Sequence, residues 1–159
     1  MMVKHVRKAA LLASSVVMMS GALVAGTASS ASAASGPNYC GGSYAFKGSW
    51  PMRAQSNQSI IGYIDVYWSS SAGKNCAIAR PNTWVSHVEF IDVALKTSNV
   101  DDWSGPGVAT DGLNSNYHSY AGPVYISARG KCISFAGHFM WGYSLPPWAV
   151  GVYENKYCG

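Results

Sequence analysis

The amino-acid sequence predicts an all-β protein, a small antiparallel β-sandwich or barrel stapled by two disulfides. Six Trp, ten Tyr and four Phe all lie beyond residue 33, and aromatic side chains pack well on pleated sheets. Short β-branched runs recur between turns that contain Gly and Pro, a pattern typical of sandwiches and barrels. An even set of cysteines follows the same N-terminal segment: Cys40, Cys76, Cys132 and Cys158.

Residues 1–33 have the pattern of a secretory signal peptide. Basic residues at 4, 7 and 8 precede an apolar stretch over residues 9–25, and Ala31-Ser32-Ala33 supplies a small-residue cleavage pattern. We expect cleavage after Ala33, which leaves residues 34–159 as a single all-β domain. No second apolar run of about 20 residues follows, so we expect no membrane partner after cleavage. The predicted location is therefore extracellular.

Charge gives no support for a polyanionic partner. Three of the eleven Lys and Arg residues lie within the predicted leader, whereas all seven acidic residues lie beyond it. Residues 34–159 therefore carry eight basic and seven acidic side chains, a net charge of +1. Nucleic acid and anionic membrane surfaces are recognised through clustered positive charge, so we expect neither as a partner.

Ser59–Ser69 is the clearest strand. Ile60, Ile64 and Val66 fall on one face and Tyr63 and Asp65 on the other, which predicts a central strand with the Asp65 side nearer to water. The turn at Ser69–Lys74 then leads into a returning strand, Asn75–Arg80, ended by Pro81.

The rest of the chain predicts further short strands. Trp84–Leu95 fits both helical spacing and a period of two, and its β-branched content without a helix stop signal favours a strand. Residues 98–116 are rich in Asn, Asp, Ser and Gly, which indicates a surface loop with at most a short strand at Val108–Thr110. Three later segments also have strand character: Ser119–Ala128, Cys132–Gly137 and Ala149–Glu154.

The four cysteines allow three pairings, all of which are compatible with an oxidising exterior. Cys132 and Cys158 flank a segment with Gly and Pro whose ends can meet as neighbouring strands. This favours a Cys132–Cys158 disulfide and leaves Cys40 to pair with Cys76.

A run of residues before and across the third cysteine carries a family resemblance. "SYAGPVYISARGKCI", the earlier "AGKNCAI" and the final "YCG" resemble the spore-associated protein A family of small secreted actinobacterial proteins. The resemblance implies a secreted domain at the spore or hyphal surface, and it implies no catalytic residue. By itself, Gly122-Pro123 predicts a bend at the entrance to a sheet, because Gly adopts positive φ and Pro fixes its own φ.

The sequence predicts no catalytic, metal or cofactor site. Residues 34–159 contain His87, His118 and His138, but no Gly-x-Ser-x-Gly turn accompanies them. His87-x-Glu89 has two potential metal ligands on one strand face without a third. Adjacent Asp101 and Asp102 lack the opposing acid that a glycosidase needs, and with Asp111 they match no EF-type calcium loop.

Two binding functions remain as alternatives to a non-enzymatic structural protein of the spore or hyphal surface. Four aromatic residues in segments that we interpret as loops are candidate ligand contacts for spore-coat or cell-wall polysaccharide: Trp103, Trp141, Tyr143 and Trp148. The stiff segment "SLPPW", residues 144–148, is typical of the rigid loops that small proteinase inhibitors present.

Overall fold

The computed structural model describes residues 36–142 and 148–159, which belong to one compact unit, Ala31–Gly159. The predicted leader lies outside the described residues. Nine strands occur within the described ranges: β1 (Ala45–Ala54), β2 (Ile60–Ser69), β3 (Lys74–Pro81), β4 (Val88–Ile91), β5 (Val93–Thr97), β6 (Val108–Asp111), β7 (Ala121–Ser127), β8 (Ile133–Trp141) and β9 (Trp148–Lys156). No helix among these residues is long and apolar enough to cross a bilayer.

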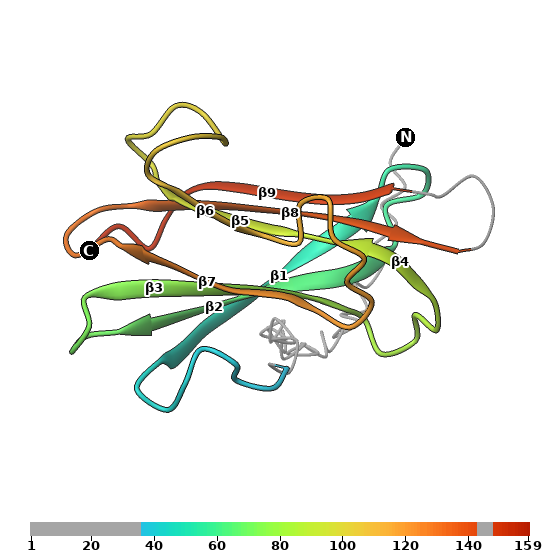
Figure 1. The fold of residues 1–159 in the computed structure, drawn as a ribbon, viewed down its shortest axis with the longest axis horizontal. Helices are drawn as coiled ribbons and strands as arrows, with labels where there is room; N and C mark the ends of the chain where they lie inside the picture. The colour runs from blue at the N-terminus through green and yellow to red at the C-terminus, as the bar shows by residue number, and fades with distance from the viewer. Residues whose placement is uncertain (1–35, 143–147) are drawn as a thin grey trace, which may run out of the picture. The chain divides into compact units, whose positions relative to one another are not determined.

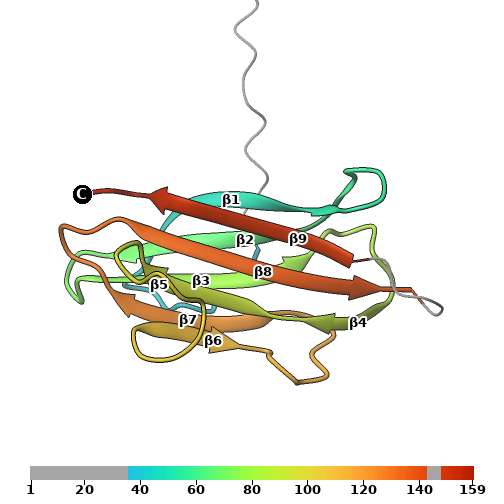
Figure 2. The ribbon, with the colours of Figure 1, turned by 90° about the horizontal axis from the view of Figure 1, so that it is seen from above.

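The strands form one antiparallel sheet that curls into a nearly closed barrel. The strand order is β6-β5-β8-β9-β1-β2-β3-β7, with β4 added on β8. Figure 1 shows two layers, one with β9, β8, β5 and β6 and the other with β2, β3 and β7, while β1 crosses between them. The two ends of the order, β6 and β7, contact each other, and Figure 2 shows them side by side. The predicted fold class is confirmed.

A single main core fills the space between the layers. Its largest fully buried side chains include Phe135, Phe139 and Met52. Met52 of β1 packs over Gly137 and Gly151, which are register partners on β8 and β9. A Cβ atom on Gly137 would lie 2.9 Å from the Met52 Sδ atom, so the lack of a side chain there makes room for the methionine.

β1 has no counterpart among the predicted strands. It contains Gly48 and Pro51, two residue types that are depleted in strands. The strand tolerates them because it pairs along its length with β2 and reaches β9 only at Arg53 and Ala54. Pro51 therefore has one partner strand, and its missing N–H group interrupts no ladder on the other side.

The predicted strand Trp84–Leu95 is divided in the structure. β4 and β5 both pair with β8, and Asp92 separates them. Its backbone N–H donates to the carbonyl oxygen of His138 at 3.1 Å, and its Oδ1 atom accepts the backbone N–H of His138 at 2.8 Å. Trp84 and Val85 precede β4 instead of belonging to it.

The other predicted elements agree with the structure within a few residues. The hairpin of β2 and β3 turns at Ser69–Lys74, and β6 and β7 lie at the expected positions. β8 and β9 extend beyond their predicted ends, to Trp141 and from Trp148. Gly122 has a φ of 98°, as the predicted bend requires.

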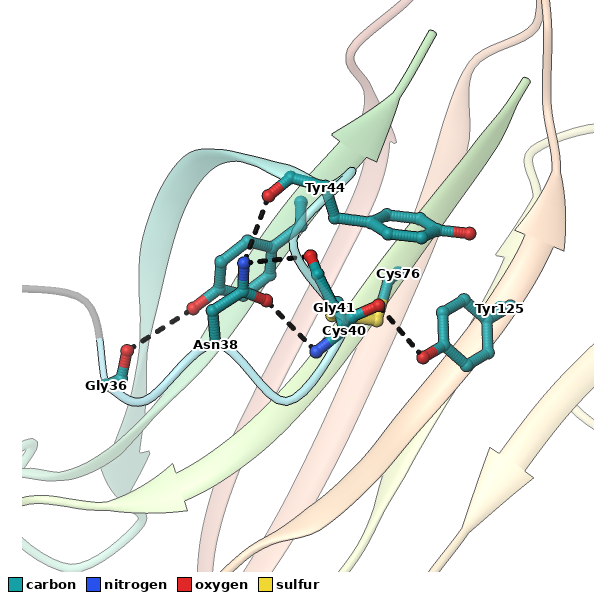
Figure 3. Close-up of a disulfide and its surroundings, with 8 residues drawn as sticks. Gly36, Asn38, Cys40, Gly41, Tyr44, Cys76 and Tyr125 are labelled. Atoms are coloured by element: carbon teal, nitrogen blue, oxygen red, sulfur yellow. Dashed lines mark hydrogen bonds between the residues drawn. A yellow bond between two sulfur atoms is a disulfide. The ribbon is translucent and has the colours of Figure 1, made fainter. Parts of the chain in front are cut away.

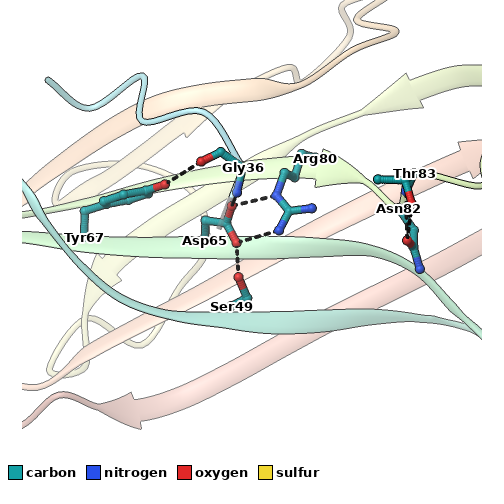
Figure 4. A network of polar contacts seen from close by, with 7 residues as sticks. All are labelled: Gly36, Ser49, Asp65, Tyr67, Arg80, Asn82 and Thr83. Atoms are coloured by element: carbon teal, nitrogen blue, oxygen red, sulfur yellow. Dashed lines mark hydrogen bonds and ion pairs between the residues drawn. The ribbon is translucent and has the colours of Figure 1, made fainter. Parts of the chain in front are cut away.

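The expectation that Asp65 faces water is wrong, because its side chain is only 1% exposed. Its Oδ2 atom accepts the Arg80 Nε–H at 2.6 Å and the Gly36 N–H at 2.9 Å, and its Oδ1 atom accepts the Ser49 hydroxyl. Figure 4 shows these partners converging on one carboxylate. Buried charges are retained when they are paired and hydrogen-bonded, and these contacts meet that requirement.

The N-terminal segment Gly36–Tyr44 covers this face of β2 and β3. A small second core lies under it, formed by Cys40, Tyr67, Cys76 and Ile78. The Cys40–Cys76 disulfide fastens the segment, and the Tyr125 hydroxyl donates to the Cys40 carbonyl oxygen at 3.2 Å (Figure 3).

Both predicted disulfides are present. Cys40 pairs with Cys76, and their Cα atoms are 6.1 Å apart, a usual distance for a disulfide. Cys132 pairs with Cys158 and joins the residue before β8 to the chain after β9. No free cysteine occurs in the part of the chain that the structure describes.

Replacing Asp65 with Asn should lower the free energy of unfolding by about 3–5 kcal/mol, because removing one partner of a buried ion pair is strongly destabilising. Urea denaturation followed by tryptophan fluorescence measures this change. Glu154→Gln alters an exposed carboxylate on β9 and should change stability by about 0.5 kcal/mol or less. Equal stability of the Asp65→Asn variant and the unaltered protein would contradict a stabilising role for the buried carboxylate.

Replacing Cys40 and Cys76 together with Ser should lower the free energy of unfolding by about 2–4 kcal/mol, because the disulfide constrains the unfolded chain. It should also allow limited proteolysis within residues 36–44, detected by mass spectrometry. The Cys132→Ser/Cys158→Ser variant serves as the control, since it loses a disulfide but keeps this segment fastened. Cleavage at the same rate in both variants would show that Cys40–Cys76 does not hold the segment.

Candidate functional site

The structure places the predicted aromatic contacts at two ends of the sheet. Trp103 lies in the β5–β6 loop, and its ring centroid is 4.4 Å from the Nζ atom of Lys96. Lys96 pairs with Ser134 at one end of β8, whereas Trp148 pairs with Met140 at the other. Ser134 and Met140 are therefore about 20 Å apart along β8, because a β-strand rises about 3.3 Å per residue. The structure therefore does not bring Trp103 and Trp148 into one site.

Trp141 and Trp148 lie on neighbouring strands rather than in loops, which corrects the sequence interpretation. Trp141 ends β8 and packs against the core, with its ring centroid 6.2 Å from that of Phe139. Trp148 begins β9 and is 44% exposed, and its ring centroid lies 6.4 Å from that of Phe90. Tyr143 and residues 144–147 of the candidate inhibitor loop lie outside the described residues. Trp148 is thus the most accessible of the three described candidates.

Each of the three described histidines has a local partner. His87 Nε2 lies 2.6 Å from Glu89 Oε1, so the predicted His-x-Glu pair does meet. His118 Nδ1 donates to the carbonyl oxygen of Val88 at 2.6 Å. No group of three or more His, Cys, Asp or Glu side chains within the described ranges is arranged to hold a metal ion.

His138 and Asp92 form a partly buried pair. His138 Nδ1 lies 3.0 Å from Asp92 Oδ1 and 3.2 Å from Oδ2, and the Asp92 side chain is 5% exposed. The hydrogen bond to Asp92 raises the pKa of His138, against the opposing effect of desolvation. The pair lies where β4 ends and β5 begins, so it holds this junction against β8.

Three hollows that share lining residues lie along the connection between β6 and β7, residues 112–120, and we call them together the 112–120 groove. One hollow, of about 540 Å³, is lined by Trp148, Phe90 and Asn116 among others. Asn116 also lines the next hollow, of about 390 Å³, together with Tyr117 and His118.

The third hollow of the groove has a volume of about 540 Å³. Ser119 and Tyr120 line both the second and the third hollow. Tyr39 lies there with its ring stacked on that of Tyr120, at a centroid distance of 4.1 Å and an interplanar angle of 10°.

Sequence reasoning included Trp148 but missed the tyrosines of this groove. Tyr117 and Tyr120 lie in the stretch "YHSYAGPVY", where the adjacent strand pattern favoured a purely structural interpretation. The available signal was a pair of tyrosines among polar residues directly before a strand. Tyr39 had no such signal, because its approach to Tyr120 depends on how the N-terminal segment folds back over β3.

Stability should fall as pH rises through the raised pKa of His138. The contribution of this group is fully present below its unfolded pKa of about 6.5, because the charged imidazole is stabilised only in the folded protein. Urea denaturation at a series of pH values from about 5 to 8.5 measures the dependence. His138→Gln and Asp92→Asn should both flatten it. A dependence that persists unchanged in both variants would assign it to other groups.

Comparison with known proteins gives one informative match. No protein-family model matches the chain, and no solved structure matches it. Over 113 residues the chain is 32% identical to spore-associated protein A from Streptomyces coelicolor. The aligned region covers 71% of this chain and 64% of that relative. The chain thus spans slightly less than two thirds of the length of the relative. The predicted resemblance to the spore-associated protein A family is confirmed by this match.

Proposed function

We propose that this protein is exported and serves as a non-enzymatic structural component at the surface of spores or hyphae. The observation that carries the proposal is the relation to a protein named for its association with spores. The matched region includes less than two thirds of that relative, so the comparison supports a location more directly than a detailed task.

The disulfides support export. Structural disulfides persist in oxidising compartments and are rare in the cytosol. Here both fasten terminal segments: Cys40 ties the N-terminal segment to β3, and Cys158 ties the C-terminal residues to Cys132. A chain held in this way suits an environment outside the cell, in agreement with the predicted leader over residues 1–33.

The contacts of the imidazole groups support a structural role. His138 binds Asp92 at the β4–β5 junction, and His118 binds the backbone at the start of β4. His87 forms an ion pair with Glu89 when it is protonated. All three side chains thus hold β4 or the residues that flank it.

Binding of spore-coat or cell-wall polysaccharide is the second candidate function. The exposed face of Trp148 favours it, because aromatic rings on a protein surface stack on apolar faces of ligands. Trp103 lies near the other end of β8, so it would contact a polysaccharide at a site separate from that of Trp148.

We expect the protein to be recovered from washed spores or from the culture medium, with Ala34 as its first residue. Immunoblotting of spore-surface, medium and cytosolic fractions, with N-terminal sequencing, measures this in the organism that makes it. A variant that lacks residues 2–33 is the control and should stay in the cytosolic fraction. Recovery of the full-length chain with its leader intact in the cytosol alone would contradict the proposal.

A further inference from the structure

We propose that the 112–120 groove binds an extended, uncharged polysaccharide chain. This inference rests on the proposed location at the spore or hyphal surface and specifies which part of the molecule makes the contact. Trp148 lines this groove, and the fold brings Tyr117 and Tyr39 to it from other segments of the chain.

An exposed aromatic ring lines each of the three hollows of the groove. Trp148, Tyr117 and Tyr39 are 44%, 39% and 43% exposed, and each lines a different one of the three adjoining hollows. Aromatic rings carry a large apolar face at low conformational cost, so they stack well on the C–H faces of sugar rings. A polymer of sugars offers such faces repeatedly, which matches rings set in successive hollows.

Polar side chains line the same hollows as the aromatic rings. Asn114, Ser115 and Asn116 line the hollow beside Trp148, and Ser119 lies where the second and third hollows meet. Amide and hydroxyl side chains both donate and accept hydrogen bonds, as sugar hydroxyl and acetamido groups do. The hollows are open, and each has the volume of an ordinary ligand pocket.

Charge favours an uncharged polymer. Glu89 and Asp111 contribute negative charge to the lining, while the guanidinium of Arg80 is ion-paired with the buried Asp65. Polyanions are bound through clusters of Lys and Arg with available charge. The described lining residues of the groove form no such cluster.

The fold also holds the groove in shape before any ligand binds. Asp111 Oδ2 accepts the Gly122 N–H at 2.7 Å, and Asp111 Oδ1 accepts the Tyr117 hydroxyl at 3.4 Å. Gly112 has a φ of 86°, and a Cβ atom there would lie 2.3 Å from the Ile91 carbonyl oxygen, so the segment starts in close contact with β4. A site ordered in advance loses less conformational entropy on binding.

Titration calorimetry with N-acetylglucosamine and cello-oligosaccharides of two to six units tests the inference. At least one series should bind with an affinity that rises with length, because longer chains reach more of the hollows. Trp148→Ala and Tyr117→Ala should each weaken binding of the longest oligomer about tenfold or more, as expected for loss of an anchoring aromatic. Tyr117→Phe keeps the ring but loses the hydroxyl contact with Asp111, so it should weaken binding less than Tyr117→Ala does.

Trp103→Ala is the matched control, because it removes a tryptophan at the other end of β8 and should leave binding unchanged. The inference is overturned if neither series binds, if affinity does not depend on length, if polyglutamate or polyphosphate binds instead, or if only Trp103→Ala weakens binding.

Recovery of the Trp148→Ala variant from washed spores separates oligosaccharide binding by the groove from the proposed role at the spore surface. If the Trp148→Ala variant loses oligosaccharide binding but is recovered from spores normally, the surface role stands. If the unaltered protein binds oligosaccharides but is absent from spores and medium, only the surface role is contradicted.

Discussion

The buried carboxylate of Asp65 is the constraint on which the rest of the structure depends. It joins three parts of the chain that are distant in sequence: Ser49 on β1, Arg80 on β3 and Gly36 in the N-terminal segment. A buried carboxylate without these partners would carry a large desolvation cost, so the segment must close over it. The Cys40–Cys76 disulfide then keeps the segment in place. The stacking of Tyr39 on Tyr120, and with it one end of the 112–120 groove, follows from this closure.

The barrel differs at its two ends. The end where β8 begins carries the Cys132–Cys158 disulfide and the loop with Trp103. The other end carries Trp148 and the segment between β6 and β7. The Cys132–Cys158 disulfide and Trp148 thus lie at opposite ends of the sheet. Antiparallel sheets suit this division because their connections gather at the two ends, away from the core.

The contact between β6 and β7, the strands at the two ends of the sheet order, closes the barrel beside the 112–120 groove. These strands end the order of the sheet, and the Asp111 side chain bridges them by accepting the Gly122 N–H. A short edge strand limits exposure of unpaired backbone groups, and β6 has only four residues. The same aspartate accepts the Tyr117 hydroxyl, so closure of the barrel and the position of a groove tyrosine depend on one side chain.

The sequence by itself predicted the fold class, most strand positions, the favoured disulfide pairing and the family resemblance. Period-two alternation and turn residues act locally, and they locate strands such as β2, β3 and β7 without knowledge of their neighbours. Only the tertiary structure decided that Asp65 is buried, that β1 is a strand despite Pro51, and that Tyr39 meets Tyr120. Alternation separates the two faces of a strand, but which faces become covered depends on segments far away in the sequence.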